Sequence, residues 1–275
     1  MPDITVTFLG TGAGVSVDRA HTAIVIDCAD GTRLLVDASS GNTVMRQGAA
    51  MGMTASQFDQ VLLTHHHGDH MGGIPFISGQ RRFAGPNDPA MHVYSTEEAL
   101  DRLGKVCQVT QMNVPSADQD GAYLTDGRAF LRWTAVDNDQ WVNLGPTTRA
   151  CTFSADHISG AVGWKIESNE VSVVFSGDTR FSEHVAEAAQ GARLLIHEAF
   201  STDADQQAAA NRGHSTAGEA ARIAAQAGVA ELIITHITPS FHANTQPRRR
   251  RQTPFPGPDN GRQRPHPGYC RHAID

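Results

Sequence analysis

Short runs of alternating or continuous apolar residues recur along the chain and predict a protein rich in β-sheet. Residues 4–9 alternate apolar and polar positions, and residues 23–27 and 33–37 flank Asp30-Gly31, a pair that favours a hairpin turn. Residues 61–63 form a continuous apolar run of the kind found in buried strands. We therefore expect a strand over each of these four segments.

The rest of the chain continues the pattern of strands separated by helices. Further strands are predicted at residues 91–94, 150–155, 161–166, 171–175, 193–196 and 231–235. Helices are predicted at residues 41–51, from about residue 96, at 182–189 and at 220–228. Residues 115–145 show no clear period. Their Trp133 and Trp141 either line a substrate pocket or pack as partly buried residues.

Histidine and acidic residues follow the ends of several predicted strands. Directly after residue 63, His65, His67, Asp69 and His70 fall within six positions. In an extended chain His65 and His67 point the same way, and a turn at Gly68 directs the other two elsewhere. Zinc takes neutral imidazole and carboxylate as ligands, but a pair of ligands leaves each ion short of its usual four. Later strands end in further residues of this type, namely His157, Asp178, His197, Glu198 and His236.

Loops beyond strand ends are favoured places for metal and catalytic sites, because a rigid sheet holds them in place. The sequence therefore predicts a metal site assembled from these strand ends. The alternative for the first histidine cluster is a solvent-exposed, histidine-rich loop without a structured site.

Charge is distributed unevenly over the 275 residues. The formal net charge is −7, but the segment from Gln246 onward carries seven arginines against two aspartates, so the remainder is more acidic still. We expect one domain over residues 1–246 and an irregular, Arg/Pro-rich tail over residues 247–275. An acidic body repels a polyphosphate, which argues mildly against a nucleic-acid substrate.

The composition of the chain also indicates the cellular compartment in which we expect the protein. The sequence contains no run of about 20 apolar residues that could span a membrane, and its first residues lack the features of a secretory signal. The cysteines are scattered without a C-x-x-C pair, which favours reduced, buried thiols: Cys28, Cys107, Cys151 and Cys270. We therefore predict a cytoplasmic protein without a membrane partner.

The motifs together resemble those of the metallo-β-lactamase superfamily, and most specifically its ribonuclease Z-like branch. The H-x-H-x-D-H loop of the superfamily is His65-x-His67-x-Asp69-His70 here. The branch-specific motifs are LGTG at 9–12, His157 six residues before Gly163-Trp164, SGDT at 176–179, IHEA at 196–199, GHST at 213–216 and ITH at 234–236. The resemblance covers roughly residues 3–240. It implies an α+β fold, a four-layer αββα sandwich of two mixed β-sheets with helices on the outer faces and the metal site along one edge.

The resemblance also implies two zinc ions per chain, with Mn²⁺ and Fe²⁺ as alternatives. One ion would be held by His65, His67 and His157, the other by Asp69, His70 and His236, with Asp178 as the bridge. A hydroxide bridging the ions would be the nucleophile, and Asp69 would orient the water and accept its proton.

The resemblance also implies two further residues that lie next to the metal ligands without binding metal. His214 would protonate the leaving group and Glu198 would tune it. The alternative for His214 is a residue at a helix start that bonds the backbone. His197 is expected in the core.

The substrate prediction rests on a departure from the family. Members that process tRNA usually insert a long, glycine-rich and basic arm between the third histidine position and the bridging aspartate. Here 20 residues separate His157 from Asp178, enough for a hairpin. The main prediction is therefore hydrolysis of a small activated substrate by a homodimer, the substrate being an ester, lactone, cyclic phosphodiester or electrophilic aryl ether or halide. Endonucleolytic cleavage of RNA 3′ ends is the alternative, and a non-catalytic partner subunit with the same fold is the second.

Overall fold

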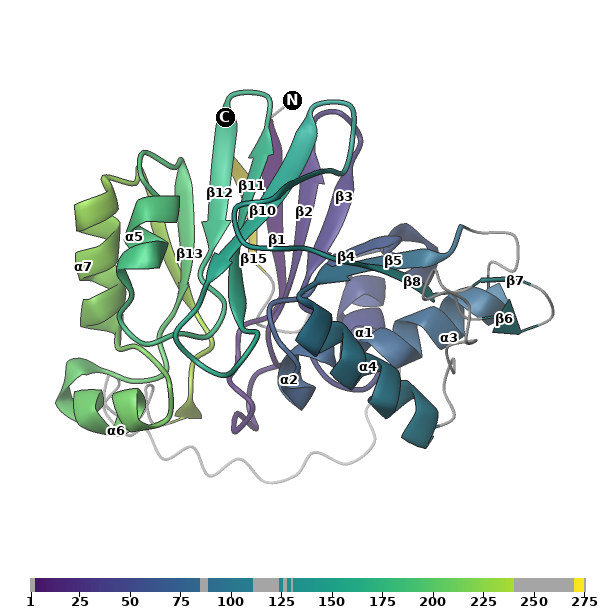
Figure 1. Ribbon diagram of the computed structural model, residues 1–275, viewed down its shortest axis with the longest axis horizontal. Coiled ribbons are helices and arrows are strands. Elements are labelled where there is room, and N and C mark those ends of the chain that lie inside the picture. Colours follow the sequence, from purple (N-terminus) through teal and green to yellow (C-terminus); the bar gives the residue numbers. More distant parts are fainter. Residues whose placement is uncertain are drawn as a thin grey trace, which may run out of the picture.

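The computed structural model describes residues 3–84, 89–110, 124–125, 128–129, 131–239 and 270–274. Two sheets face each other at the centre, and helices cover their outer faces (Figure 1). This arrangement confirms the predicted four-layer αββα sandwich with two mixed sheets.

The first sheet consists of seven strands. Their order across the sheet is β15 (Cys270–Ile274), β1 (Ile4–Gly10), β2 (Ala23–Cys28), β3 (Arg33–Val36), β4 (Gln60–Leu62), β5 (Met91–Ser95) and β8 (Leu131–Ala135). Its helices are α1 (Thr43–Ala50), α2 (Gly68–Met71), α3 (Ile74–Ala84) and α4 (Glu97–Thr110), with the short 3₁₀ helix η1 (Ala55–Gln57). From β15 to β3 neighbouring strands are antiparallel, whereas β3, β4, β5 and β8 are parallel.

The second sheet consists of six strands. Their order is β14 (Leu232–Thr235), β13 (Leu194–Glu198), β12 (Val171–Phe175), β11 (Val162–Ser168), β10 (Thr148–Ser154) and β9 (Trp141–Asn143). Its helices are α5 (Glu183–Ala188), α6 (Gln206–Asn211) and α7 (Ala217–Ala227), with the 3₁₀ helix η2 (Asp203–Asp205). A separate hairpin pairs β6 (Leu124–Thr125) with β7 (Arg128–Ala129). Among the described helices, none combines the length and the apolar character that crossing a membrane requires.

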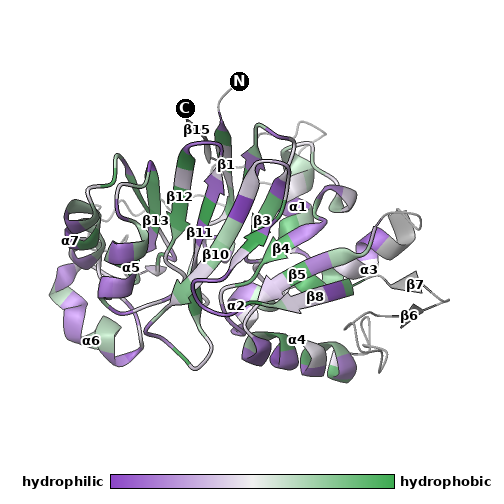
Figure 2. Ribbon diagram, turned by 45° about the horizontal axis from the view of Figure 1, so that its top comes forward, coloured by the Kyte–Doolittle hydropathy of each residue, from purple (hydrophilic) through white to green (hydrophobic). Residues whose placement is uncertain are grey.

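Apolar side chains fill three interfaces, one between the sheets and one under each helical layer. Figure 2 shows apolar residues gathered on the strands, whereas α4 and α7 alternate between apolar and polar positions, as expected of helices with one buried face. The fully buried Trp164 of β11 donates a hydrogen bond from Nε1 to the carbonyl of Leu63, at 3.2 Å. The second sheet thereby holds the segment from which His65 projects.

The segment that the pattern left undefined, residues 115–145, is described in part. It contains β8 and β9, whose tryptophans both lie outside the site described below. Trp133 packs against the core beneath α4. Trp141 is 37% exposed on the outer face of the second sheet, with the Arg149 guanidinium 4.1 Å above its ring. Neither side chain is among the residues that converge at the strand ends.

The prediction of an irregular tail is wrong for its last residues. Cys270–Ile274 form β15, which pairs antiparallel with β1 so that Ile274 lies opposite Ile4. Hydrogen bonds to a distant strand edge stabilise this segment, and periodicity within five residues does not reveal such a partner. The remaining predicted tail, residues 247–269, lies outside the described residues, and the single domain over residues 1–246 stays a prediction.

Asp30, in the turn between β2 and β3, links the two sheets. Its Oδ2 accepts hydrogen bonds from the Thr147 N–H and the Thr148 hydroxyl, both at 2.9 Å, and its Oδ1 accepts one from the Thr32 N–H at 2.9 Å. Burial raises the pKa of this carboxyl, but the backbone N–H groups outweigh burial and hold the pKa well below its usual range.

We expect Asp30→Asn to lower the free energy of unfolding by about 1–2 kcal/mol at pH 7, after allowance for solvent screening. The folded-state pKa is depressed, so the contribution of the carboxylate is present above the unfolded pKa of about 3.9 and is lost as the pH falls below it. Urea unfolding of metal-free protein at pH 7 and at about pH 3 measures both quantities. Asp27→Asn is the control on the same hairpin, because Asp27 forms a partly exposed ion pair with Arg33. Equal losses for the two variants at both pH values would contradict the assignment.

Candidate metal centre

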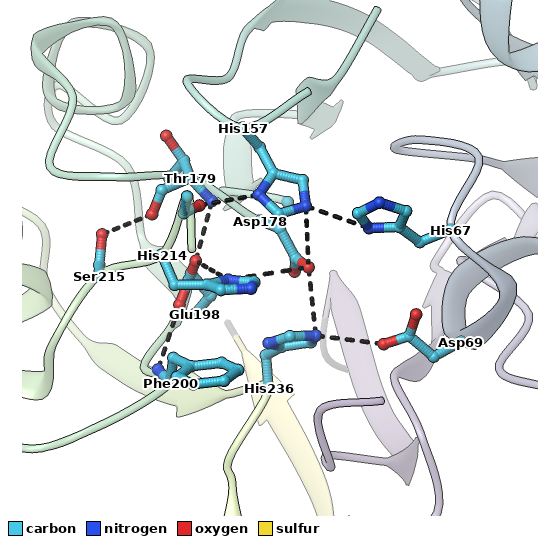
Figure 3. A network of polar contacts seen from close by, with 12 residues as sticks. His67, Asp69, His157, Asp178, Thr179, Glu198, Phe200, His214, Ser215 and His236 are labelled. Atoms are coloured by element: carbon cyan, nitrogen blue, oxygen red, sulfur yellow. Dashed lines mark hydrogen bonds and ion pairs between the residues drawn. The ribbon is translucent and has the colours of Figure 1, made fainter. Parts of the chain in front are cut away.

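The ligand-type residues predicted from the sequence converge at one edge of the sandwich (Figure 3). His65 and His67 lie between β4 and α2, and Asp69 and His70 lie in α2 itself. The other three follow the ends of β10, β12 and β14, and they are His157, Asp178 and His236. Residues more than 160 positions apart thus face one another, because the strands of both sheets end at the same edge.

The first group of ligand atoms consists of three imidazole nitrogens. His65 Nε2 lies 3.0 Å and His157 Nε2 lies 3.1 Å from His67 Nδ1. The Nδ1 atom of His157 donates to the carbonyl of Gly213 at 2.8 Å, so its Nε2 carries a lone pair. His65 is fixed in the same tautomer, since its Nδ1 lies 3.0 Å from a Thr64 hydroxyl that donates to Asp37. The lone pairs of His65 Nε2 and His157 Nε2 therefore both point at His67 Nδ1. A cation between the three rings would stabilise this arrangement.

Asp178 connects this group to the second one. Its Oδ2 lies 3.7 Å from His65 Nε2 on one side, and 3.3 and 3.2 Å from the Nε2 atoms of His70 and His236 on the other. Asp69 completes the second group, with its Oδ2 3.5 Å from His70 Nε2 and 3.4 Å from His236 Nε2. The segment after β1 packs over Asp69 through Gly14. A Cβ at Gly14 would lie only 2.9 Å from Asp69 Oδ2, so a larger residue there would displace the Asp69 carboxylate.

Burial and mutual proximity set the charges in the cluster. His65 is fully buried, and burial holds the pKa of its imidazole well below the usual value. Burial raises the pKa of Asp178, but the imidazoles of His236 and His70 outweigh it and keep the pKa of this carboxyl well below its usual range. Burial lowers the pKa of His70, but the carboxylates of Asp178 and Asp37 outweigh burial and raise this pKa well above its usual value, so a metal ion would displace a proton there. Metals bind neutral imidazole and ionised carboxylate.

The donor set fits a divalent metal. Two ligands on a tetrahedral zinc ion, with bonds of about 2.0–2.1 Å, lie roughly 3.3 Å apart, close to the 3.0 Å between His65 and His67 and the 3.2 Å between Asp178 and His236. The buried atoms His70 Nε2 and Asp178 Oδ1 have no hydrogen-bond partner among the described residues. The chemistry and the spacing of the donor atoms therefore fit a metal site.

Asp37 belongs to the candidate site, although the sequence did not predict it there. Its fully buried carboxylate accepts hydrogen bonds from His70 Nδ1 at 2.7 Å and from the Thr64 N–H and hydroxyl at 2.9 Å each. It thus fixes the tautomer that presents His70 Nε2 to the site. A signal was present in the sequence, because Asp37 is an acidic residue at the end of a predicted strand (residues 33–37).

Glu198 and His214 lie beside the cluster, as the resemblance implies. Glu198 Oε1 lies 2.9 Å from His214 Nδ1, and Asp178 Oδ2 lies 4.0 Å from the same nitrogen. The imidazole of His214 thus bonds a carboxylate, not the backbone. Burial and the Asp178 carboxylate raise the pKa of Glu198 well above its usual value, whereas burial lowers the pKa of His214.

His197 points elsewhere. It is fully buried, and its Nδ1 donates to the carbonyl of Glu198 at 2.7 Å, so it belongs to the core as predicted.

A comparison with protein families defines the class of protein to which this chain belongs. The profile of the Beta-lactamase superfamily domain matches residues 32–237, about three quarters of the chain. The chain therefore belongs to the metallo-β-lactamase superfamily, ribonuclease Z-like branch, and it is a metal-dependent hydrolase.

Individual relatives then narrow the comparison. The chain is 31% identical to Ribonuclease Z of Methanothermobacter thermautotrophicus, with 86% of this chain and 87% of that protein aligned. It is also 31% identical to Ribonuclease Z of Haloferax volcanii, over 88% of this chain and 86% of the relative. The crystal structure of the short form of human tRNase Z superposes with a TM-score of 0.69 at 25% identity, covering 86% of this chain and 93% of the human protein.

These relatives contradict the prediction of a small activated substrate. That prediction rested on the short spacing between His157 and Asp178, which the structure fills with the β11–β12 hairpin. The spacing excludes a long insertion at that place, but it does not exclude RNA contacts made by other surfaces. Relatives named Ribonuclease Z align with this chain over most of their length. The interpretation of a small-molecule substrate is therefore wrong.

Proposed function

We propose that this chain is an endonuclease that cleaves RNA precursors at their 3′ ends, with precursor tRNA as the substrate class. One observation carries the proposal: the complete ligand cluster lies in a chain that is 31% identical, over most of its length, to a Ribonuclease Z. A scissile phosphodiester is anionic and electrophilic at phosphorus, and a dinuclear metal site stabilises charge of that kind.

The proposed cofactor is a pair of zinc ions. His65, His67 and His157 would hold one, and Asp69, His70 and His236 the other, with Asp178 shared. The support is geometric, because the Asp178 Oδ2 atom lies within 4 Å of an imidazole nitrogen from either group. When bound, such ions lower the pKa of water and withdraw charge from a phosphate.

The side chains of the chain supply the proton transfers. Asp69 is the residue proposed to orient the attacking water and accept its proton, since its carboxylate reaches the cluster from the rim with 17% of the side chain exposed. His214 is proposed to give a proton to the leaving ribose oxygen. Glu198 holds His214 Nδ1, which leaves Nε2 for that task.

Incubation of the zinc-loaded protein with a precursor tRNA is expected to give one discrete 3′-trimmed product. Asp69→Asn should reduce the rate by about 10²–10⁴-fold, because proton transfer of this kind contributes that much. Glu187→Gln, at a carboxylate with 77% of its side chain exposed on α5, is the matched control and should cleave at the wild-type rate. Denaturing gel electrophoresis of end-labelled RNA resolves the product. Intact precursor after incubation with protein that has taken up zinc or manganese would overturn the proposal.

Two finer expectations accompany this function. We propose zinc as the physiological metal. Elemental analysis of the purified protein identifies the metal that it carries. A homodimer stays a prediction. Light scattering coupled to size-exclusion chromatography measures the molar mass and thus distinguishes a dimer from a monomer.

A further inference from the structure

Phe200, two residues beyond Glu198, lies flat against the imidazole of His214. The ring centroids are 4.4 Å apart and the planes differ by 9° (Figure 3). The same ring touches His236 less closely, at 6.2 Å with planes 31° apart. Of the two imidazoles, His214 is therefore the one that Phe200 stacks on.

The backbone of Phe200 is fixed on both sides. Its N–H donates to Glu198 Oε2 at 3.1 Å and to the Ser215 carbonyl at 3.0 Å. Its carbonyl accepts a hydrogen bond from the Thr238 hydroxyl at 2.8 Å. Phe200 is thus tied to the carboxylate that binds His214, to the residue after His214, and to a residue two positions beyond His236. The ring is presented from a rigid segment.

The hydrogen bond to Glu198 alone does not determine how the imidazole of His214 is oriented. It restrains Nδ1, but rotation about χ1 and χ2 can still tilt the ring and move Nε2. The rings of His236 and His157 pack on His214 less closely than Phe200 does, with centroids 5.1 and 4.8 Å away and planes 25° and 46° apart. A parallel aromatic ring at van der Waals distance blocks the rotation, because turning the imidazole would drive its edge into the phenyl face. Stacking of this kind also adds about 0.5–1.5 kcal/mol of attraction.

We propose that Phe200 is a positioning residue that sets the plane of His214, so that Nε2 faces the leaving oxygen of the substrate. This inference rests on the function proposed above. In the step concerned, the oxygen of the attacking water bonds to phosphorus and its proton passes to Asp69. The bond from phosphorus to the ribose oxygen breaks, and that oxygen takes the proton from His214 Nε2.

The proposal predicts an effect on kcat that runs entirely through His214. Phe200→Leu keeps an apolar side chain but removes the flat face, and it should lower kcat for precursor tRNA by about 10–100-fold, with KM changed less than twofold, since small misplacements of a reacting group cost that much. Phe200→Tyr keeps the face and should restore most of the rate. Zinc content should be unchanged in both variants.

A double-mutant cycle separates positioning from general damage. If Phe200 acts through His214, Phe200→Leu has no further effect in a His214→Ala background. Cleavage of bis(4-nitrophenyl) phosphate, whose phenolate leaves without a proton, should fall less than threefold in Phe200→Leu. Multiplicative losses in the cycle, or equal losses on both substrates, would overturn the proposal.

A spectroscopic measurement tests the stacking without any turnover. In metal-free protein, the His214 ring protons lie over the phenyl face and should be shifted upfield by its ring current. The shift should disappear in Phe200→Leu and persist in Phe200→Tyr. Unchanged His214 resonances in the leucine variant would overturn the inference, even if wild-type protein cleaves RNA. Failure of the wild type to cleave RNA, with the ring-current shift present, would instead count against the proposed function.

Discussion

Replacement of Asp178 by alanine is expected to abolish both metal retention and RNA cleavage. Its carboxylate is 2% exposed, and the same oxygen approaches imidazole nitrogens of both ligand groups. Without it, the two ligand groups would have no shared anion from the protein between them. Elemental analysis should find about two zinc ions per wild-type chain and fewer than one in the variant. Turnover should fall by about 10³-fold or more, which corresponds to several kcal/mol of lost charge stabilisation.

A buried carboxylate outside the metal centre provides the control for this experiment. Glu219 is 6% exposed and closes the capping box of α7 with Thr216. Glu219→Gln should retain wild-type metal content even if it unfolds at a lower temperature. Wild-type turnover by metal-free protein, or by Asp178→Ala, would remove the metal centre from the chemistry altogether.

The second large effect is expected at Asp37, which touches no proposed metal position. In Asp37→Asn the amide can accept a hydrogen bond from Thr64, but its NH₂ group would face His70 Nδ1. The imidazole then gains by moving its proton to Nε2, where a metal ligand needs a lone pair. We expect zinc affinity to fall by about 10–100-fold and the metal-free protein to lose about 1–3 kcal/mol of stability.

Competition with a chromogenic chelator measures the affinity, and urea unfolding of metal-free protein measures the stability. Asp101→Asn is the matched control, because Asp101 forms an exposed ion pair with Lys105 on α4, with side chains 53% and 58% exposed. Wild-type zinc affinity in Asp37→Asn would show that His70 keeps its tautomer without the carboxylate.

Much of the fold was predictable because its strands are short, apolar and bounded by turn residues. The hairpin at Asp30-Gly31 and the capping box of Thr216 and Glu219 are local signals, and the structure has a turn and a helix start there. The proposed ligands were recognisable for a related reason: each follows a strand, and parallel or mixed sheets bring strand ends to one edge.

The remaining features depend on contacts between distant residues. The stack of Phe200 on His214 requires knowledge of how the segments after β13 and before α7 meet, and no spacing in the sequence encodes it. Asp37 looked like the end of a strand because its partners, Thr64 and His70, lie about 30 positions later. The substrate class was misjudged for another reason, since the length of one hairpin says little about the surfaces that hold RNA.

The pairing of Ile4 with Ile274 joins two strands that lie 270 positions apart in the sequence. Among the described residues, β15 is the strand that covers the outer backbone edge of β1, so this edge is open when β15 is not in place. An open edge of this kind is a template on which another nascent chain can add. We conclude that β15 protects this edge of the sheet, so a chain in which Cys270–Ile274 do not pair with β1 carries a greater tendency to aggregate.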